Sequence, residues 1–237
     1  MPEEISEHVR FVALNRMNYR KALQIQQQRA ESLLAEQDDL QTVYTVEHPR
    51  TITIGRNGSS EHILASPSDL NARGFDVLEV DRGGDVTYHG PGQLVVYPIL
   101  HLGPFGNDVA KYVRNLEEMV IRALSEVGIV ATRNDDYPGV WVGDGKICAV
   151  GARMKRRPSG EFVSSHGIAL NVTTNLEDFK TIVPCGITDR SVTSVANELG
   201  TDASYDEWEE RLYRRFAEVF DVAVERVPSD ALEGSSL

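Results

Sequence analysis

The chain has 237 residues, of which 41% are hydrophobic and 25% are charged, as is typical of a soluble globular protein with one sizeable core. Its formal net charge of −12 argues against nucleic acid as the main partner. No stretch approaches the roughly 18 apolar residues of a membrane span, and the acidic start MPEEISEHVR is unlike a signal peptide. We therefore expect a cytoplasmic monomer that acts neither on nucleic acid nor in a membrane.

The first half of the chain contains several short apolar runs and one polar helix. Residues 18–37 show helical spacing, with Leu23, Ala30, Leu33 and Leu34 on one side. The expected strands are residues 9–14, 42–47, 51–55, 77–80 and 93–100. A break at His48-Pro49 separates the second strand from the third.

The second half of the chain begins with the clearest helix, residues 107–127, which Gly128 ends. Ser204 and Glu207 form a capping box before a further helix that contains Trp208. The expected strands are residues 140–142, 146–154, 162–172 and 222–227. This order predicts an α/β (α+β) fold with one mixed sheet flanked by helices. We expect a single domain over residues 1–227 and a mobile tail over 228–237.

Residues 81–93, DRGGDVTYHGPGQ, form a glycine-rich stretch. Glycine lets the backbone approach a ligand closely, and the N–H groups of such a loop can line a carbonyl or an anion. The same spacing is also typical of tight turns between strands. The chain has neither a GxxxxGK[ST] phosphate loop nor a GxGxxG turn, so these motifs give no support for nucleotide binding.

The two cysteines have different predicted roles. Cys148 lies in the alternating segment KICAVGARM, which favours a buried side chain in the core. Cys185 lies between Pro184 and Gly186 at an expected bend, where a thiol is either exposed and nucleophilic or buried in the turn. Two cysteines do not suggest a disulfide framework.

Lys146 follows the turn Gly143-Asp144-Gly145 and begins an expected strand. Most lysines are solvated surface charges. However, an ammonium group beside a cysteine favours the thiolate, and a partly buried lysine can accept and return a proton. Lys146 is therefore either a surface charge or the proton partner of Cys185.

His89 suits either a substrate contact or a structural hydrogen bond, whereas His166 suits either a catalytic base or a structural role. His89 lies in the glycine-rich stretch, and His166 opens the segment SHGIALNV. Ser164 and Ser165 precede His166 without a GxSxG elbow, so a serine hydrolase is a weak hypothesis. The histidines show no HExxH or paired Cys/His spacing, so we expect no metal.

Five segments, taken together, resemble the lipoyl(octanoyl) transferase family. They are EHPRTITIGR at 47–56, RGGDVTYHGPGQLVVYPIL at 82–100, PGVWVGDGKICAVGARM at 138–154, SHGIALNV at 165–172 and VPCGITDRSVTSV at 183–195. The combination of RGG…HGPGQ with PCG is highly specific. The segment KRRPSGEF at 155–162 is longer and more basic than the connection usual in the family.

The resemblance implies the fold of the biotin/lipoate protein ligase catalytic domain, with a mixed sheet flanked by helices. It implies that Cys185 carries the acyl thioester and that Lys146 is its proton partner. It also implies an acyl site formed by Arg82, Gly83, Gly84, Asp85, Val86, Thr87, Tyr88, His89, Ala149, Val150, Gly151, His166, Gly167 and Ile168.

The resemblance further implies the reaction and its partners. The donor is octanoyl-acyl carrier protein, which delivers the octanoyl group on phosphopantetheine. The acceptor is a lysine on the lipoyl domain of an oxo-acid dehydrogenase or of the glycine-cleavage H protein. A thioester is already activated, so neither ATP nor a metal is expected.

Acidic protein partners would be repelled by a chain of net charge −12. The basic run Arg153, Lys155, Arg156 and Arg157 is either a local docking surface or a solvated loop.

Three other classes of function stay open: an ATP-dependent lipoate or biotin ligase on the same fold, a non-catalytic module that binds lipoyl domains or carrier proteins, and a cysteine hydrolase.

Overall fold

The computed structural model describes residues 7–183 and 191–229. One group of strands consists of β1 (His8–Arg16), β2 (Gln41–Glu47), β6 (Gln93–Ile99), β7 (Thr132–Arg133), β8 (Gly139–Val142), β9 (Gly145–Arg156), β10 (Phe162–Asn171), β11 (Ser191–Val192) and β12 (Ala223–Arg226). They form a mixed sheet in the order β12-β1-β2-β6-β10-β9-β8-β7, with β11 paired to β9. A separate sheet has the order β4-β3-β5, from β3 (Thr51–Ile54), β4 (Asp76–Glu79) and β5 (Val86–His89).

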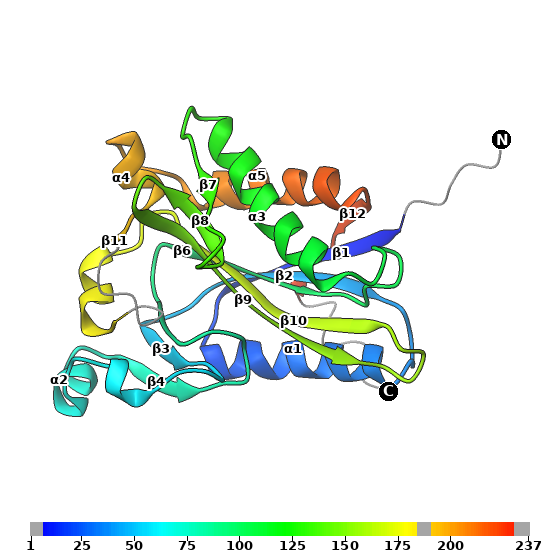
Figure 1. The fold of residues 1–237 in the computed structure, drawn as a ribbon, viewed down its shortest axis with the longest axis horizontal. Coiled ribbons are helices and arrows are strands. Elements are labelled where there is room, and N and C mark those ends of the chain that lie inside the picture. Colours follow the sequence, from blue (N-terminus) through cyan, green and yellow to red (C-terminus); the bar gives the residue numbers. More distant parts are fainter. Residues whose placement is uncertain (1–6, 184–190, 230–237) are drawn as a thin grey trace.

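Helices lie on both faces of the large sheet (Figure 1). They are α1 (Tyr19–Leu34), α2 (Pro67–Ala72), α3 (Val109–Ser125), α4 (Val195–Leu199) and α5 (Tyr205–Phe220), with the short 3-10 helices η1 (Ser60–His62) and η2 (Leu176–Thr181). In Figure 1, α3 and α5 lie on one side of the sheet, whereas α1 and the small sheet lie on the other. No helix in the described part of the chain is long and apolar enough to cross a bilayer.

The α/β fold with a large mixed sheet and flanking helices is confirmed, but the expectation of one sheet is wrong. β5 lies inside the glycine-rich stretch, where only turns were expected, and it pairs antiparallel with β3, with Thr53 opposite Thr87. Four-residue strands carry too little periodicity to reveal their partners. The expected tail lies outside the described residues from residue 230 onward.

The predicted helix starts agree with the structure because side chains cap them. Ser204 Oγ accepts a hydrogen bond from the Glu207 N–H at 3.4 Å, and Asp108 Oδ1 accepts one from the Lys111 N–H at 2.9 Å. Each cap satisfies an N–H that has no partner within the helix. The short helices α2 and α4 were not predicted.

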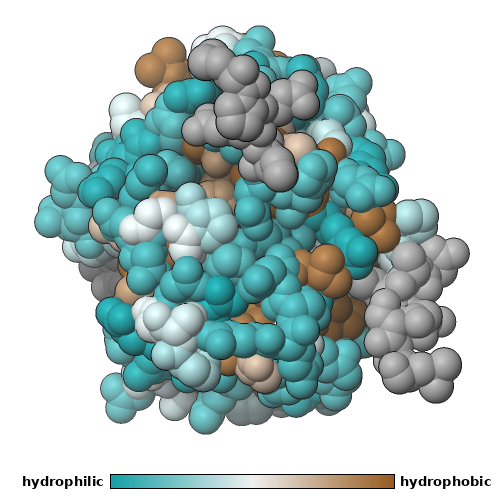
Figure 2. All heavy atoms as spheres, turned by 90° about the vertical axis from the view of Figure 1, so that its right-hand side faces the viewer, coloured by the Kyte–Doolittle hydropathy of each residue, from teal (hydrophilic) through white to brown (hydrophobic). Residues whose placement is uncertain are grey.

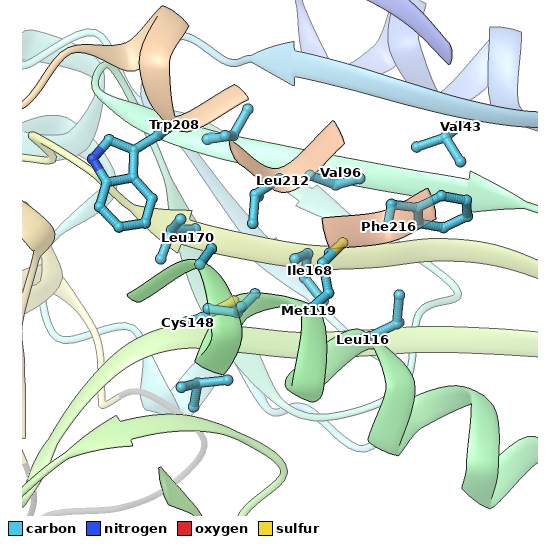
Figure 3. Packing of buried hydrophobic residues seen from close by; sticks show 14 of the residues in the cluster. Val43, Val96, Leu116, Met119, Cys148, Ile168, Leu170, Trp208, Leu212 and Phe216 are labelled. Carbon is cyan, nitrogen blue, oxygen red and sulfur yellow. The ribbon is translucent and has the colours of Figure 1, made fainter. Parts of the chain in front are cut away.

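The main core lies between the large sheet and helices α3 and α5 (Figure 3). Met119 of α3 and Phe216 of α5 are fully buried there, and Cys148 of β9 points into the same core. Burial raises the pKa of the Cys148 thiol, so this cysteine stays protonated and is a weak nucleophile. The prediction that Cys148 is a core residue is confirmed.

The small sheet is tied to η2 by the buried carboxyl group of Asp178. Its Oδ2 accepts hydrogen bonds from Arg50 Nε and from the Tyr88 hydroxyl, both at 2.9 Å, and its Oδ1 accepts one from Arg73 Nη2 at 2.7 Å. Burial opposes ionisation of this carboxyl, but these hydrogen bonds outweigh it and hold the pKa of Asp178 below its usual value.

We expect Asp178→Asn to lower the free energy of unfolding by about 2 kcal/mol at neutral pH, because two arginines lose a charged acceptor. The arginines are partly exposed, which limits the loss. A lowered folded-state pKa stabilises the fold above the usual aspartate pKa of about 3.9 and stops doing so as the pH falls through the folded value. Urea unfolding should therefore show a smaller difference from the wild type in acid.

Glu177→Gln is the matched control, since the Glu177 side chain is 70% exposed and should change stability by less than about 0.5 kcal/mol. Equal losses in the two variants would contradict a specific role for Asp178.

Candidate functional site

A narrow cavity lies between the middle of strands β9 and β10 and the loop that leads into β5. The loop and β5 line it with Arg82, Gly83, Gly84, Asp85, Thr87 and His89. The two long strands line it with Lys146, Ala149, Val150, Gly151, His166, Gly167, Ile168 and Ala169. Three segments of the chain, residues 82–89, 146–151 and 166–169, therefore meet at one cavity.

Two of the residues expected at the acyl site, Val86 and Tyr88, lie elsewhere. Both are fully buried beneath the small sheet, where Tyr88 packs against Phe75 and Phe179. Successive side chains of a strand point to opposite faces, so Thr87 and His89 of β5 face the cavity, whereas Val86 and Tyr88 face away from it. These two side chains therefore do not line the cavity.

The glycine-rich loop is held against both sheets. Arg82 donates hydrogen bonds to Thr53 of β3, from Nε to Oγ1 at 3.0 Å and from Nη2 to the carbonyl at 2.7 Å. The Gly83 N–H binds the Ala152 carbonyl of β9 at 3.1 Å. Gly84 has a φ of +85°, which glycine adopts without strain. The loop therefore forms one wall of the cavity.

His166 occupies a constrained position in this site. Its φ of +57° is rare for a residue with a side chain, and its Nε2 lies 2.8 Å from Asp81 Oδ1. This hydrogen bond, together with nearby Arg153, lowers the pKa of the Asp81 carboxyl. The Nδ1 of His166 is buried and has no hydrogen-bond partner among the described residues, so this ring atom can bind a ligand or water.

His89 is held by a chain of polar side chains behind the cavity. Its Nδ1 lies 2.8 Å from Gln93 Oε1, Gln93 Nε2 donates to Asn171 Oδ1 at 3.0 Å, and Asn171 Nδ2 donates to the Thr193 carbonyl at 3.0 Å. Burial lowers the pKa of His89 well below its usual value. The imidazole is therefore neutral, and its buried Nε2 has no hydrogen-bond partner within the part of the chain that the structure describes.

Lys146 lies at the mouth of the cavity and is only 8% exposed. Its Nζ donates to the Pro138 carbonyl at 3.3 Å and lies 4.8 Å from the centre of the Trp141 ring. Gly139 lies close to the backbone of β9, because a Cβ there would lie 2.6 Å from the Cys148 carbonyl oxygen. The interpretation of Lys146 as a solvated surface charge is wrong.

Cys185 lies outside the described residues, but the chain on either side of it is placed. Before the gap, the Val183 N–H binds the His62 carbonyl at 2.8 Å. After it, β11 runs parallel to β9, with Val192 in register with Lys146. The segment that carries Cys185 therefore joins a strand directly beside Lys146.

A wider groove, called here the outer groove, meets the cavity at Lys146. Asn57, Val109, Val113, Tyr137, Pro138, Ala152 and Met154 line it, together with six residues that also line the cavity. Its volume is about 510 Å³, compared with about 50 Å³ for the cavity. The site thus combines a slender cavity and a broad groove on either side of one lysine.

The basic run at 153–157 is largely engaged by the chain itself. Arg153 forms an ion pair with Asp81, and Arg157 forms ion pairs with Asp39 and Glu161. The Arg156 guanidinium stacks on the Phe162 ring at 4.2 Å. The segment ends strand β9, and two of its four basic side chains, Arg153 and Arg157, are paired with carboxylates.

Four lining residues were not predicted from the sequence: Tyr19, Val95, Tyr97 and Ala169. They come from α1, β6 and β10 and reach the cavity only through long-range pairing. His48 supports Tyr97, because its Nδ1 lies 2.8 Å from the Met17 carbonyl and its Nε2 lies 2.9 Å from the Tyr97 hydroxyl.

Among the described residues no group of three or more His, Cys, Asp or Glu could hold a metal.

Comparisons with known proteins point to one family. Residues 18–217 match the family model of the lipoyl protein ligase A/B catalytic domain. The chain is 50% identical over 210 residues to the octanoyltransferase of Chloroflexus aurantiacus, covering 87% of this chain and 92% of that one. It is 48% identical over 208 residues to the octanoyltransferase of Solibacter usitatus, covering 88% and 91%.

Solved structures with the same fold include lipoate-protein ligase A bound with ATP, with a TM-score of 0.79 and 21% identity over 96% of this chain and 92% of that one. The bipartite lipoate protein ligase of Thermoplasma acidophilum has a TM-score of 0.73 and 19% identity, over 97% and 90%. These similarities extend the fold assignment to nearly the whole chain.

We expect Gly151→Leu to weaken binding of octanoate by about tenfold or more, since each buried methylene contributes about 0.8 kcal/mol and the new side chain occupies the same cavity. A Cβ at Gly151 would already lie 3.3 Å from both Arg82 Cδ and the Gly83 carbonyl oxygen. Calorimetric titration with octanoate measures the change. Val130→Leu, at a residue 82% exposed, should bind as the wild type does; unchanged binding by Gly151→Leu would place the acyl chain elsewhere.

Proposed function

We propose, starting from the fact that the chain belongs to the lipoyl protein ligase A/B catalytic domain family, that it transfers an octanoyl group from acyl carrier protein to a lysine of a lipoyl domain. The lipoyl domains would be those of oxo-acid dehydrogenases or of the glycine-cleavage H protein. The reaction needs neither ATP nor a metal, because the donor is a thioester. We place it in the cytoplasm and assign it to a monomer.

The observation that carries this proposal is the position of Lys146 between the slender cavity and the outer groove. A linear acyl chain suits the cavity, and the reacting carbonyl then lies at Lys146. Strand β11 brings the chain that follows Cys185 to this same lysine. A nucleophile and a proton carrier can therefore meet where the acyl chain ends.

In the first half-reaction, Lys146 takes the thiol proton of Cys185, and the thiolate attacks the donor thioester. The Gly83 N–H is bound to Ala152, so we assign stabilisation of the oxyanion to the Gly84 N–H. The tetrahedral intermediate collapses, the phosphopantetheine sulfur leaves, and Lys146 returns the proton to it. The octanoyl group is then a thioester of Cys185.

In the second half-reaction, the neutral amine of the acceptor lysine attacks the Cys185 thioester. The amine gives a proton to Lys146, the amide bond forms, and the sulfur of Cys185 leaves and recovers the proton. The two protein substrates use one site in turn, so the kinetics are ping-pong.

Chain-length preference follows from burial of the acyl chain. The six methylenes of an octanoyl group contribute on the order of 5 kcal/mol at about 0.8 kcal/mol each. One methylene more or less changes discrimination by only about 10–200-fold. Neighbouring chain lengths are therefore used at reduced efficiency rather than excluded.

We expect the wild-type protein to gain the mass of one octanoyl group when it is incubated with octanoyl-acyl carrier protein, and to lose it when a lipoyl domain is added. Cys185→Ala should form no adduct. Cys148→Ala is the matched control and should form the adduct normally, because Cys148 is buried and its thiol pKa is raised. Intact-mass spectrometry measures all three proteins.

The other outcomes identify other functions. Modification of the lipoyl domain that needs ATP and persists in Cys185→Ala indicates a ligase. Loss of the adduct to water without modification of the lipoyl domain indicates a hydrolase. Binding of either protein without any reaction indicates a non-catalytic module.

We expect Lys146→Met to slow formation of the acyl-enzyme by about 10²–10⁴-fold, the range attributed to a positioned proton carrier. Lys146→Arg distinguishes proton transfer from positive charge, because arginine keeps the charge but does not release a proton. We expect this variant to form the acyl-enzyme as slowly as Lys146→Met does. Lys21→Met, on the exposed side of α1, is the control. Near-normal rates in Lys146→Arg would show that only the positive charge matters.

A further inference from the structure

We propose that the outer groove binds the pantetheine arm of the thioester donor; this inference rests on the proposed function. The arm joins the thioester sulfur to a phosphate through two amides and a carbon that bears two methyl groups. The groove would then be a second determinant of donor recognition, beside the cavity that holds the acyl chain.

The first argument is continuity. Gly83, Gly84, Asp85, Lys146, Val150 and Gly151 line both the cavity and the outer groove. When an acyl chain fills the cavity, its carbonyl carbon reaches these shared residues. The group on the other side of the sulfur must then leave the cavity through the outer groove.

The second argument is the chemistry of the groove walls. Val109 and Val113 lie four residues apart on α3 and so face the same side of that helix. Ala152 and Met154 lie two residues apart on β9, so their side chains share one face of that strand and form the other wall. These apolar side chains suit the dimethyl carbon of the arm. The exposed amide side chain of Asn57 supplies a polar partner for its amides.

The third argument is charge and width. Among the described residues that line the outer groove, Lys146 is the only cation and there is no arginine. This lining suits an uncharged arm rather than a triphosphate, which is usually held by several cations or backbone N–H groups. The groove is also larger than the cavity, so it can accept a branched arm.

The test compares two octanoyl donors in the presence of a lipoyl domain. Octanoyl-pantetheine carries the whole uncharged arm, whereas octanoyl-N-acetylcysteamine keeps the sulfur and the first amide but lacks the dimethyl portion. We expect Val113→Trp, which fills the groove from α3, to raise the KM for octanoyl-pantetheine by about tenfold or more and the KM for the short donor by less than about twofold.

Met154→Trp fills the same groove from the opposite wall and should give the same contrast, so the test does not depend on one variant folding. Val130→Trp is the matched control, since Val130 is 82% exposed and lies outside the groove, and it should leave both KM values unchanged.

Three results would overturn the inference. Equal effects on the two donors would show that the groove does not distinguish the arm, and no effect on either would show that the arm lies elsewhere. A rise in the KM for the lipoyl domain alone would assign the groove to the acceptor lysine. Failure of the proposed function itself looks different, because the wild-type protein would then transfer octanoyl from neither donor.

Discussion

The hydrogen bonds that hold the glycine-rich loop between the two sheets create the cavity on which the site depends. Arg82 binds Thr53 of the small sheet, and the next residue, Gly83, binds Ala152 of the large sheet. Replacing Gly83 would disturb this contact, because a Cβ there would lie 2.9 Å from the Ala152 carbonyl oxygen. Without the loop in this place, β9 and β10 would present an open face rather than a slender cavity.

The cavity is bordered by polar groups that are kept neutral or paired, which suits an apolar ligand. Burial lowers the pKa of His48 to about 4 and also holds the pKa of His89 well below its usual value, so neither imidazole is charged at neutral pH. The one carboxylate bound to His166, Asp81, is also paired with Arg153. Lys146 lies where the cavity meets the outer groove, and it is the residue to which we assign proton transfer.

Arginines that could attract a partner form ion pairs with carboxylates of the chain itself. The face shown in Figure 2 is mainly hydrophilic, with apolar side chains in scattered patches. Arg157, which we considered as a docking residue, is occupied by Asp39 and Glu161. This chain has a net charge of −12, so long-range electrostatic attraction contributes little to its recognition of acidic partners. Short-range contacts such as those of the outer groove are therefore more important.

The sequence alone determined the long helices, most strands, the α/β class and the core position of Cys148, because periodicity and capping are local properties. The family motifs also indicated the residues that line the cavity. Tertiary structure decided what depends on long-range pairing. It formed the second sheet, turned Val86 and Tyr88 away from the cavity, and brought Tyr19 and Tyr97 into the cavity wall. It also decided that Lys146 is buried, since no local pattern records that Pro138 and Trp141 fold over its side chain.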